Sequence, residues 1–122
     1  MVAFHIACKI KNMMDRSHSA TISDLPVNAK IPTTWLPASI LEKLGIAREK
    51  KDLAFIMANG QTITRSVGFA IVRVGSAFTV DEVVFAEKGD LLLLGARTLE
   101  GLNLTVDPRR KKLVAAGPLP AA

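Results

Sequence analysis

Cysteine is nearly absent from this sequence, since Cys8 is the only one among 122 residues. A lone cysteine cannot form an internal disulfide, and it cannot supply the thiolates of a multi-cysteine zinc site. The chain also lacks any apolar run near the ~18 residues that a membrane-spanning helix needs, and its first residues lack the apolar stretch of a signal peptide. We therefore expect a cytoplasmic protein with no membrane association.

Aromatic residues are scarce, at 5% of the chain, and they are not interleaved with basic residues along it. The formal net charge is +5, and the basic residues are spread out except for the run at 109–112, which we expect to be solvated. Single-stranded nucleic acids are bound by aromatic platforms set beside cations. The sequence pattern therefore predicts no nucleic-acid partner, although the charge alone does not exclude one.

Hydrophobic residues, at 49%, are abundant enough for a packed core, and the length suits one domain. We expect that domain to cover residues 4–115. Gly117, Pro118 and Pro120 predict a flexible tail over residues 116–122.

Hydrophobic alternation predicts strands. Phe4, Ile6, Cys8 and Ile10 alternate with polar residues, which is typical of a half-buried strand and places Cys8 in the core. A second strand over 20–27 contains Pro26, which cannot donate to a ladder, so we expect it at an edge or a bulge.

Turn and cap residues divide the rest of the chain. Asn59-Gly60 predicts a two-residue hairpin turn in which both residues take positive φ. A helix is predicted over 37–44, begun by Pro37 and capped by Gly45, and a second over 96–102. Strands are predicted over 53–57, 61–65, 68–74, 78–85, 91–94 (buried on both faces), 104–106 and 113–115. The expected fold is all-β, mainly antiparallel, and closed or nearly closed, with one or two short helices.

Several motifs occur in a characteristic order. Trp35-Leu36-Pro37 precedes a helix that ends at Leu44-Gly45-Ile46, Leu94-Gly95 leads into a second helix, and a strand ends at Val106-Asp107-Pro108. This order resembles the retropepsin-like aspartic proteases of bacteria and archaea, with the Asn59-Gly60 hairpin in the place of the flap. The resemblance implies a half-barrel that forms a symmetric homodimer around a groove for an extended peptide. The groove and flap residues it implies are Trp35, Asn59, Gly60, Leu94 and Gly95, with no metal and no cofactor.

The chain departs from this family at the catalytic motif. Asn28, Ala29 and Lys30 stand where the family has Asp-Thr-Gly. Aspartic proteolysis needs two carboxylates that share a proton, and an amide cannot replace either of them. The sequence therefore predicts a catalytically inactive relative with no catalytic residue, acting as a peptide-binding or structural dimer. Asp24, four residues before Asn28, is the fallback for an active peptidase.

Other constellations give weaker hypotheses. Residues 27–63 also resemble a swapped-hairpin, AbrB-type DNA-binding module, but that module leaves the segments around Gly95 and Asp107 unexplained. His5 and His18 have no partner at metal-ligand spacing, so we expect surface histidines. Cys8 on an apolar strand face is expected to be inert.

Overall fold

The computed structural model describes residues 4–121, which form a mostly β fold with two short helices, as the sequence predicts. Residue 122 of the predicted tail lies outside the described residues. The elements are β1 (His5–Lys11), β2 (Ser19–Pro26), β3 (Thr34–Pro37), α1 (Ala38–Lys43), β4 (Lys50–Ile56), β5 (Thr62–Val74), β6 (Ala77–Ala86), α2 (Ala96–Leu102), β7 (Leu104–Asp107) and β8 (Lys112–Ala115).

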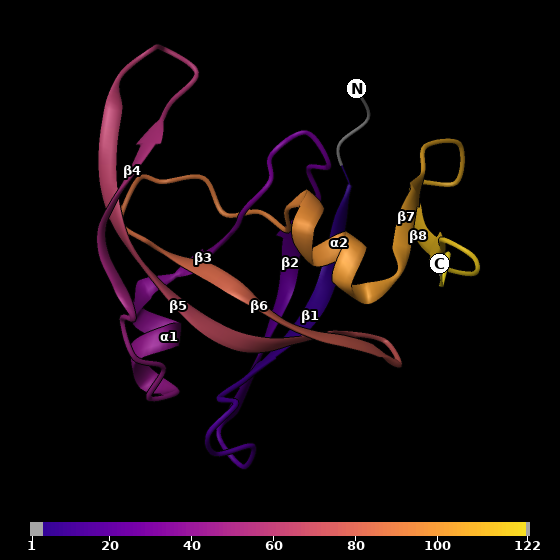
Figure 1. Ribbon diagram of the computed structural model, residues 1–122, viewed down its shortest axis with the longest axis horizontal. Helices are drawn as coiled ribbons and strands as arrows, with labels where there is room; N and C mark the ends of the chain where they lie inside the picture. Colours follow the sequence, from indigo (N-terminus) through magenta and orange to yellow (C-terminus); the bar gives the residue numbers. More distant parts are fainter. Residues whose placement is uncertain (1–3, 122) are drawn as a thin grey trace.

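One six-stranded sheet dominates the structure. Its strands lie in the order β2-β1-β5-β6-β3, and β4 pairs with β5 beyond the part of β5 that contacts β1. Neighbours run antiparallel except β3 and β6, which are parallel. Figure 1 shows the β4–β5 hairpin rising at one end and the separate β7–β8 sheet at the other. The edge position of β2 confirms the prediction from Pro26.

The sequence predicts a closed or nearly closed sheet, and the sheet is not closed. Within residues 4–121, the end strands β2 and β3 do not pair with each other, so the sheet is open rather than a barrel. The free side of β3 is instead bridged by Leu93, and β3 continues directly into α1.

The buried strand predicted over 91–94 is also wrong. Leu93 forms a single antiparallel bridge to Trp35, and Leu94 forms a single parallel bridge to Val27. Because the two leucines bond to different segments, no continuous ladder develops. Leu91 is 76% exposed, whereas Leu94 is fully buried.

Two apolar clusters lie on opposite sides of the sheet, because side chains alternate along each strand. The larger includes Cys8, as predicted, and is covered by both helices. The smaller surrounds Trp35. The members of the larger cluster include Ile10, Leu25, Leu36, Leu41, Val72, Phe85, Leu94 and Leu99, and those of the smaller are Trp35, Val67, Val84, Ala86 and Leu93.

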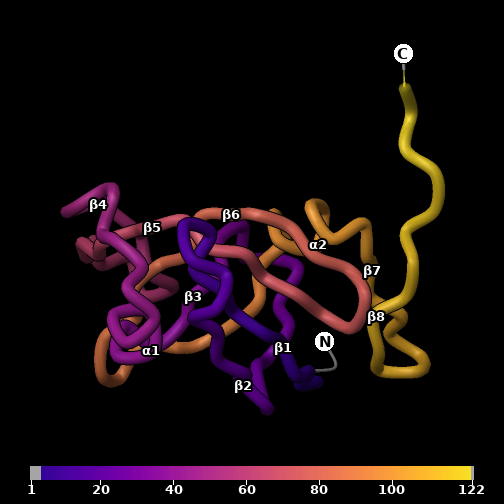
Figure 2. The backbone as a smooth tube through the Cα atoms, turned by 90° about the horizontal axis from the view of Figure 1, so that it is seen from below, coloured from indigo at the N-terminus to yellow at the C-terminus, as the bar shows by residue number. Residues whose placement is uncertain are grey.

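Both helices are short and lie where the sequence predicts them. Pro37 is the residue before the first turn of α1, and Gly45, with φ of 74°, follows its end. Asn103 ends α2 in the left-handed conformation. Neither α1 nor α2 is long or apolar enough to span a membrane, and residues 4–121 contain no helix that is. Figure 2 shows residues 116–121 extending away from the body of the molecule.

Candidate functional site

The segment between β2 and β3, residues 27–33, which we call the Asn28 loop, lies against residues 93–97. The Asn28 amide donates to the Leu94 carbonyl (3.0 Å), and the Leu94 amide donates to the Pro26 carbonyl (2.8 Å). Trp35 and Leu93 exchange two backbone hydrogen bonds of 2.9 and 3.0 Å. The structure therefore brings together Asn28, Trp35, Leu94 and Gly95, which the sequence analysis had grouped from widely separated motifs.

The side chain of Asn28 holds a local turn. Its Oδ1 accepts a hydrogen bond from the Lys30 amide (3.0 Å), and its carbonyl accepts one from the Ile31 amide (3.3 Å). This is an Asx-turn, in which a short polar side chain replaces a backbone acceptor. Asn28 is partly buried, whereas Ala29 and Lys30 are exposed. The position therefore has a structural function that either an amide or a carboxylate can perform.

Gly95 is required where α2 meets this loop. A Cβ atom at Gly95 would lie 2.3 Å from the Thr33 carbonyl oxygen, so no other residue fits without moving the backbone. The first amides of α2 are satisfied by the loop itself, because Ala96 donates to the Ile31 carbonyl (2.7 Å) and Arg97 to the Pro32 carbonyl (3.0 Å). The loop and the helix thus hold each other in place without a side-chain cap.

The β4–β5 hairpin contains Asn59 and Gly60, which the resemblance implies to be flap residues. Its turn differs from the prediction, since among Asn59 and Gly60 only Gly60 has a positive φ (86°). The Gly60 amide donates to the Met57 carbonyl and the Met57 amide to the Gln61 carbonyl, which makes a three-residue loop ending in a left-handed glycine. Asn59 instead uses its Oδ1 to accept from the Gln61 amide (2.9 Å). Its hydrogen-bonding side chain, rather than a positive φ, therefore accounts for asparagine at this position.

Apolar contacts join the hairpin to the Asn28 loop. The Trp35 and Phe55 rings meet edge to face, with centroids 5.0 Å apart. Ile63 and Leu92 pack on the same cluster, and the Trp35 indole donates to Thr33 Oγ1 (2.9 Å). Trp35 is 6% exposed and belongs to the smaller apolar cluster. Toward its tip the hairpin leaves apolar side chains uncovered, with Ile56 81% exposed.

An ion pair that the sequence analysis missed fastens the middle of the hairpin. Arg65 on β5 binds both carboxylate oxygens of Asp90, with distances of 2.7 Å from Nε and 2.8 Å from Nη2. The Glu87 amide also donates to Asp90 (2.8 Å). Hydrogen bonds from Arg65 hold the pKa of Asp90 below its ordinary value, and the Glu87 amide adds to this effect against the opposing effect of burial. Twenty-five residues separate the pair, so no local spacing could have indicated it.

Asp24 and the two histidines lie on the periphery, whereas Cys8 is buried. Asp24 is 78% exposed, and its carboxylate lies 3.9 Å from His5 Nδ1. His18 lies 3.7 Å from Asp15. Burial raises the pKa of the Cys8 thiol to about 11, so the thiol is protonated at neutral pH. No group of three or more His, Cys, Asp or Glu side chains suited to a metal ion occurs in residues 4–121.

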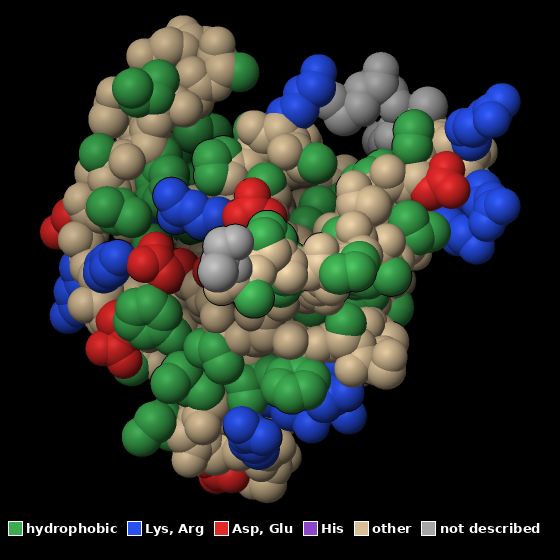
Figure 3. All heavy atoms as spheres, turned by 45° about the vertical axis from the view of Figure 1, so that its right-hand side comes forward, with side chains coloured by type: hydrophobic (Ala, Val, Ile, Leu, Met, Phe, Trp, Pro, Cys, Tyr) green, Lys and Arg blue, Asp and Glu red, His purple; other side chains and the backbone are tan. Residues whose placement is uncertain are grey.

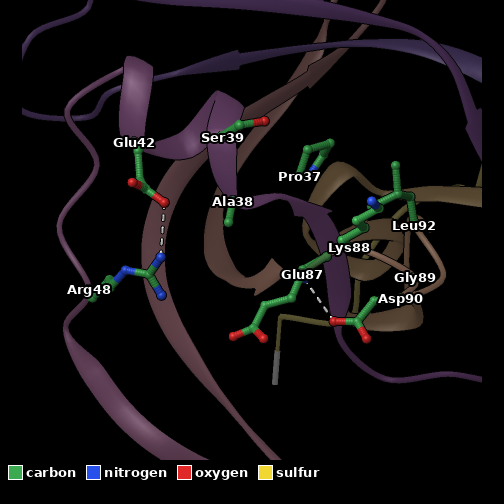
Figure 4. A pocket seen from close by; sticks show the side chains of 11 residues that line it. Pro37, Ala38, Ser39, Glu42, Arg48, Glu87, Lys88, Gly89, Asp90 and Leu92 are labelled. Carbon is green, nitrogen blue, oxygen red and sulfur yellow. Dashed lines mark hydrogen bonds and ion pairs between the residues drawn. The ribbon is translucent and has the colours of Figure 1, made fainter.

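An open pocket of about 590 Å³ lies between α1 and the loop after β6. Figure 4 shows that its charged side chains are largely engaged with one another or with neighbours: Arg48 donates to Glu42 (3.0 Å), and Asp90 accepts from the Glu87 amide. It includes none of the predicted site residues. Its lining consists of Pro37, Ala38, Ser39, Glu42, Arg48, Ala86, Glu87, Lys88, Gly89, Asp90 and Leu92.

Comparison of the chain with protein-family models and with curated proteins found no match in either. Around Asn28, the hydrogen-bonding groups described above are amides, hydroxyls and carbonyls rather than acids. Such groups can orient a polar ligand through hydrogen bonds, but they do not exchange protons near neutral pH.

Proposed function

We propose that this protein is a non-catalytic, peptide-binding relative of the retropepsin-like proteases that acts as a symmetric dimer. The observation that supports the proposal most directly is made on the β4–β5 hairpin. There, β4 has one free backbone edge, and apolar side chains beside it are uncovered. Within the described residues, β4 pairs only with β5. Leu53 and Ile56 on β4 are 37% and 81% exposed.

A free strand edge offers amides and carbonyls that an extended peptide can pair with, while apolar side chains beside it select alternate residues of that peptide. The contact between Phe55 and Trp35 links this edge to the Asn28 loop. Peptide binding of this kind needs no carboxylate, so the Asn28-Ala29-Lys30 sequence does not oppose it.

A dimer is supported by the β7–β8 sheet. These strands pair only with each other among the described residues, and a two-stranded ribbon is marginally stable by itself. Val106 and Leu113 are only partly buried where they pack against the larger cluster. A partner's strand added at β8 would extend this sheet. Sedimentation equilibrium at tens of micromolar should give a dimer, and a strict monomer would contradict this part of the proposal.

The topology does not favour the DNA-binding alternative. Residues 27–63 do not form a separate unit, because β3 pairs with β6 and the pairing of β4 with β5 extends beyond Ile63 to Val67. The displaced-aspartate alternative is likewise not favoured, since Asp24 lies on edge strand β2 beside His5.

Peptide binding can be tested by titrating the ¹⁵N-labelled protein with a capped, extended peptide of alternating valine and threonine, at up to about 1 mM. We expect amide shifts confined to β4, the hairpin turn and the Trp35 indole. Ile56→Lys should weaken these shifts, whereas Lys43→Gln on α1 should leave them unchanged. A peptide with a central proline, which cannot complete the ladder, is the matched ligand control. An absence of shifts at 1 mM peptide would overturn the proposal.

A further inference from the structure

One side of the β1–β5–β6 region carries basic and apolar side chains in register. Lys9 on β1 is opposite Arg73 on β5, which is opposite Phe78 on β6. The next row of the same face consists of Lys11, Ile71 and Val80. We call these six residues the Phe78 face. The intervening residues Cys8, Ile10, Ala70 and Val72 belong to the larger core, so the Phe78 face is directed away from it.

Two of the three apolar side chains of the Phe78 face are uncovered. Phe78 is 53% exposed and Val80 is 51% exposed, whereas Ile71, in the second row, is buried. Figure 3 shows hydrophobic side chains gathered beside Lys and Arg side chains over the lower part of the molecule. Exposed apolar side chains grouped in this way mark an interaction surface more often than scattered ones do.

The positive charge of the Phe78 face is not neutralised. In the part of the chain that the structure describes, no ion pair involves Lys9, Lys11 or Arg73. The row after Lys11, Ile71 and Val80 contains an acid, Glu82, opposite Phe69. Glu82 is already bound to Lys50 at 2.6 Å. Arg73 lies over the Phe78 ring, with its guanidinium carbon 4.9 Å from the ring centroid. A planar cation and an aromatic ring are therefore already stacked at the surface.

We propose that the Phe78 face binds single-stranded nucleic acid, with bases stacking on the ring of Phe78 beside Arg73 and phosphates bound by Lys9, Lys11 and the guanidinium of Arg73. Single strands are recognised by aromatic or guanidinium platforms on a sheet beside cations that follow the backbone. In register, β1 supplies the cations and β6 supplies the ring, about two strand spacings apart, or ~10 Å. This proposal is independent of peptide binding at the hairpin, which lies at the other end of β5.

The same features disfavour other occupants. A second copy of the chain placed on this face by a two-fold axis would set Lys9, Lys11 and Arg73 against the same cations. Duplex DNA hides its bases from a flat sheet face, so the exposed ring would gain nothing from it. An anionic membrane would use the charges but would not require stacking on an aromatic ring.

Fluorescence anisotropy with labelled 12-nucleotide probes, oligo(dT) and oligo(U), tests the proposal against the matched duplex and against vesicles of phosphatidylserine and phosphatidylcholine. Three cations predict a log–log salt slope of about −2, so affinity for the single strands should fall roughly 15-fold between 50 and 200 mM salt. Phe78→Ala should weaken binding by about 10-fold, and Phe78→Trp should restore it. The double variant Lys9→Gln/Lys11→Gln should reduce the slope to about −0.7. Lys43→Gln on α1 is the charge-matched control.

Preference for oligo(U) or oligo(dT) distinguishes RNA from DNA as the ligand, and either result supports the proposal. Three results would overturn it: no binding at 50 mM salt, equal affinity for the duplex, or binding that Phe78→Ala leaves unchanged. Vesicle binding in the absence of oligonucleotide binding would also overturn it, and would assign the face to a membrane surface instead.

Discussion

The hydroxyl oxygens of Thr34 and Thr98 lie 2.5 Å apart in the interior, and both side chains are fully buried. Thr98 donates its hydrogen to Asp81 (2.8 Å), so Thr34 must be the donor to Thr98. The oxygen of Thr34 then accepts from the Gly95 amide (2.9 Å). Because a carboxylate can only accept, Asp81 fixes the direction of every hydrogen bond in this series. Through it, Asp81 on β6 supports the junction of the Asn28 loop with α2.

Thr34→Val should destabilise the protein by about 1–3 kcal/mol, because the Gly95 amide would lose its acceptor in a buried position. Thr98→Val should have a cost of the same order. The double variant should lose less stability than the sum of the two single losses, since both changes break the same series of hydrogen bonds. Urea unfolding measures all three, with Thr105→Val on the exposed side of β7 as the control. Strict additivity would show that the two hydroxyls act independently.

Stability should fall in acid partly through Asp90. The pKa of Asp90 is lowered in the folded protein, so the stabilisation by Arg65 is fully present above the ordinary aspartate pKa of ~4 and is lost as the pH falls through the lowered value. Asp90→Asn should reduce stability at pH 7 and flatten its decline below pH 4. Urea unfolding between pH 2 and 7 tests this. Asp52→Asn is the control, because Asp52 is exposed at a left-handed position that asparagine tolerates.

The Cys8 thiol should be unreactive in the folded protein. With a pKa of about 11, roughly a thousandth of it is ionised at pH 8, and the sulfur is also buried. Labelling with a disulfide reagent at pH 8 should therefore be slow without denaturant and rapid in urea above the unfolding midpoint. Rapid stoichiometric labelling of the native protein would contradict the burial of this strand.

The purified protein should not cleave peptides at any pH from 3 to 8, since Asn28 provides no carboxylate. The variant Asn28→Asp should fold, because an aspartate oxygen can accept the hydrogen bond from the Lys30 amide equally well. We expect weak proteolytic activity only when Asp-Thr-Gly is restored at all three positions, 28–30. A fluorogenic peptide assay with and without pepstatin makes the measurement. Pepstatin-sensitive cleavage by the unmodified protein that disappears in Asp24→Ala would refute the prediction.

The turn of the β4–β5 hairpin should be mobile. Asn59 and Gly60 are exposed, and the hydrogen bonds of Asn59 are local ones to Gln61. Their amides should therefore exchange far faster than those of Leu93 and Leu94, which bond across the centre of the fold. Hydrogen exchange followed by NMR compares the two groups directly, and similar rates would show that the hairpin is rigid.

Local patterns in the sequence predict most of the elements, because alternation and turn residues act over a few positions. The strand that contains Cys8, the helix between Pro37 and Gly45, and the hairpin around Gly60 all occur near their predicted positions. The turn type was wrong because Asn59 has an alternative to positive φ, a side-chain bond to the Gln61 amide.

Long-range pairing could not be predicted in the same way. The bridges of Leu93 to Trp35 and of Leu94 to Val27 depend on which segments meet after folding, as does the Arg65–Asp90 pair. The Phe78 face could not be predicted from local sequence patterns either. Its cations and its aromatic ring are not interleaved along the chain, and only strand register places them in one row.

The parallel pairing of β3 with β6 also governs when the chain can fold. Thr34 and Trp35 pair with Val83 and Val84, so β3 has no partner until synthesis has passed those residues. β1 and β2 can pair early as a hairpin, but β1 must then wait for β5. Contacts so distant in sequence make folding slow. During translation, Trp35 and its apolar neighbours therefore stay exposed until most of the chain has left the ribosome, and in that interval the nascent protein is most prone to aggregate.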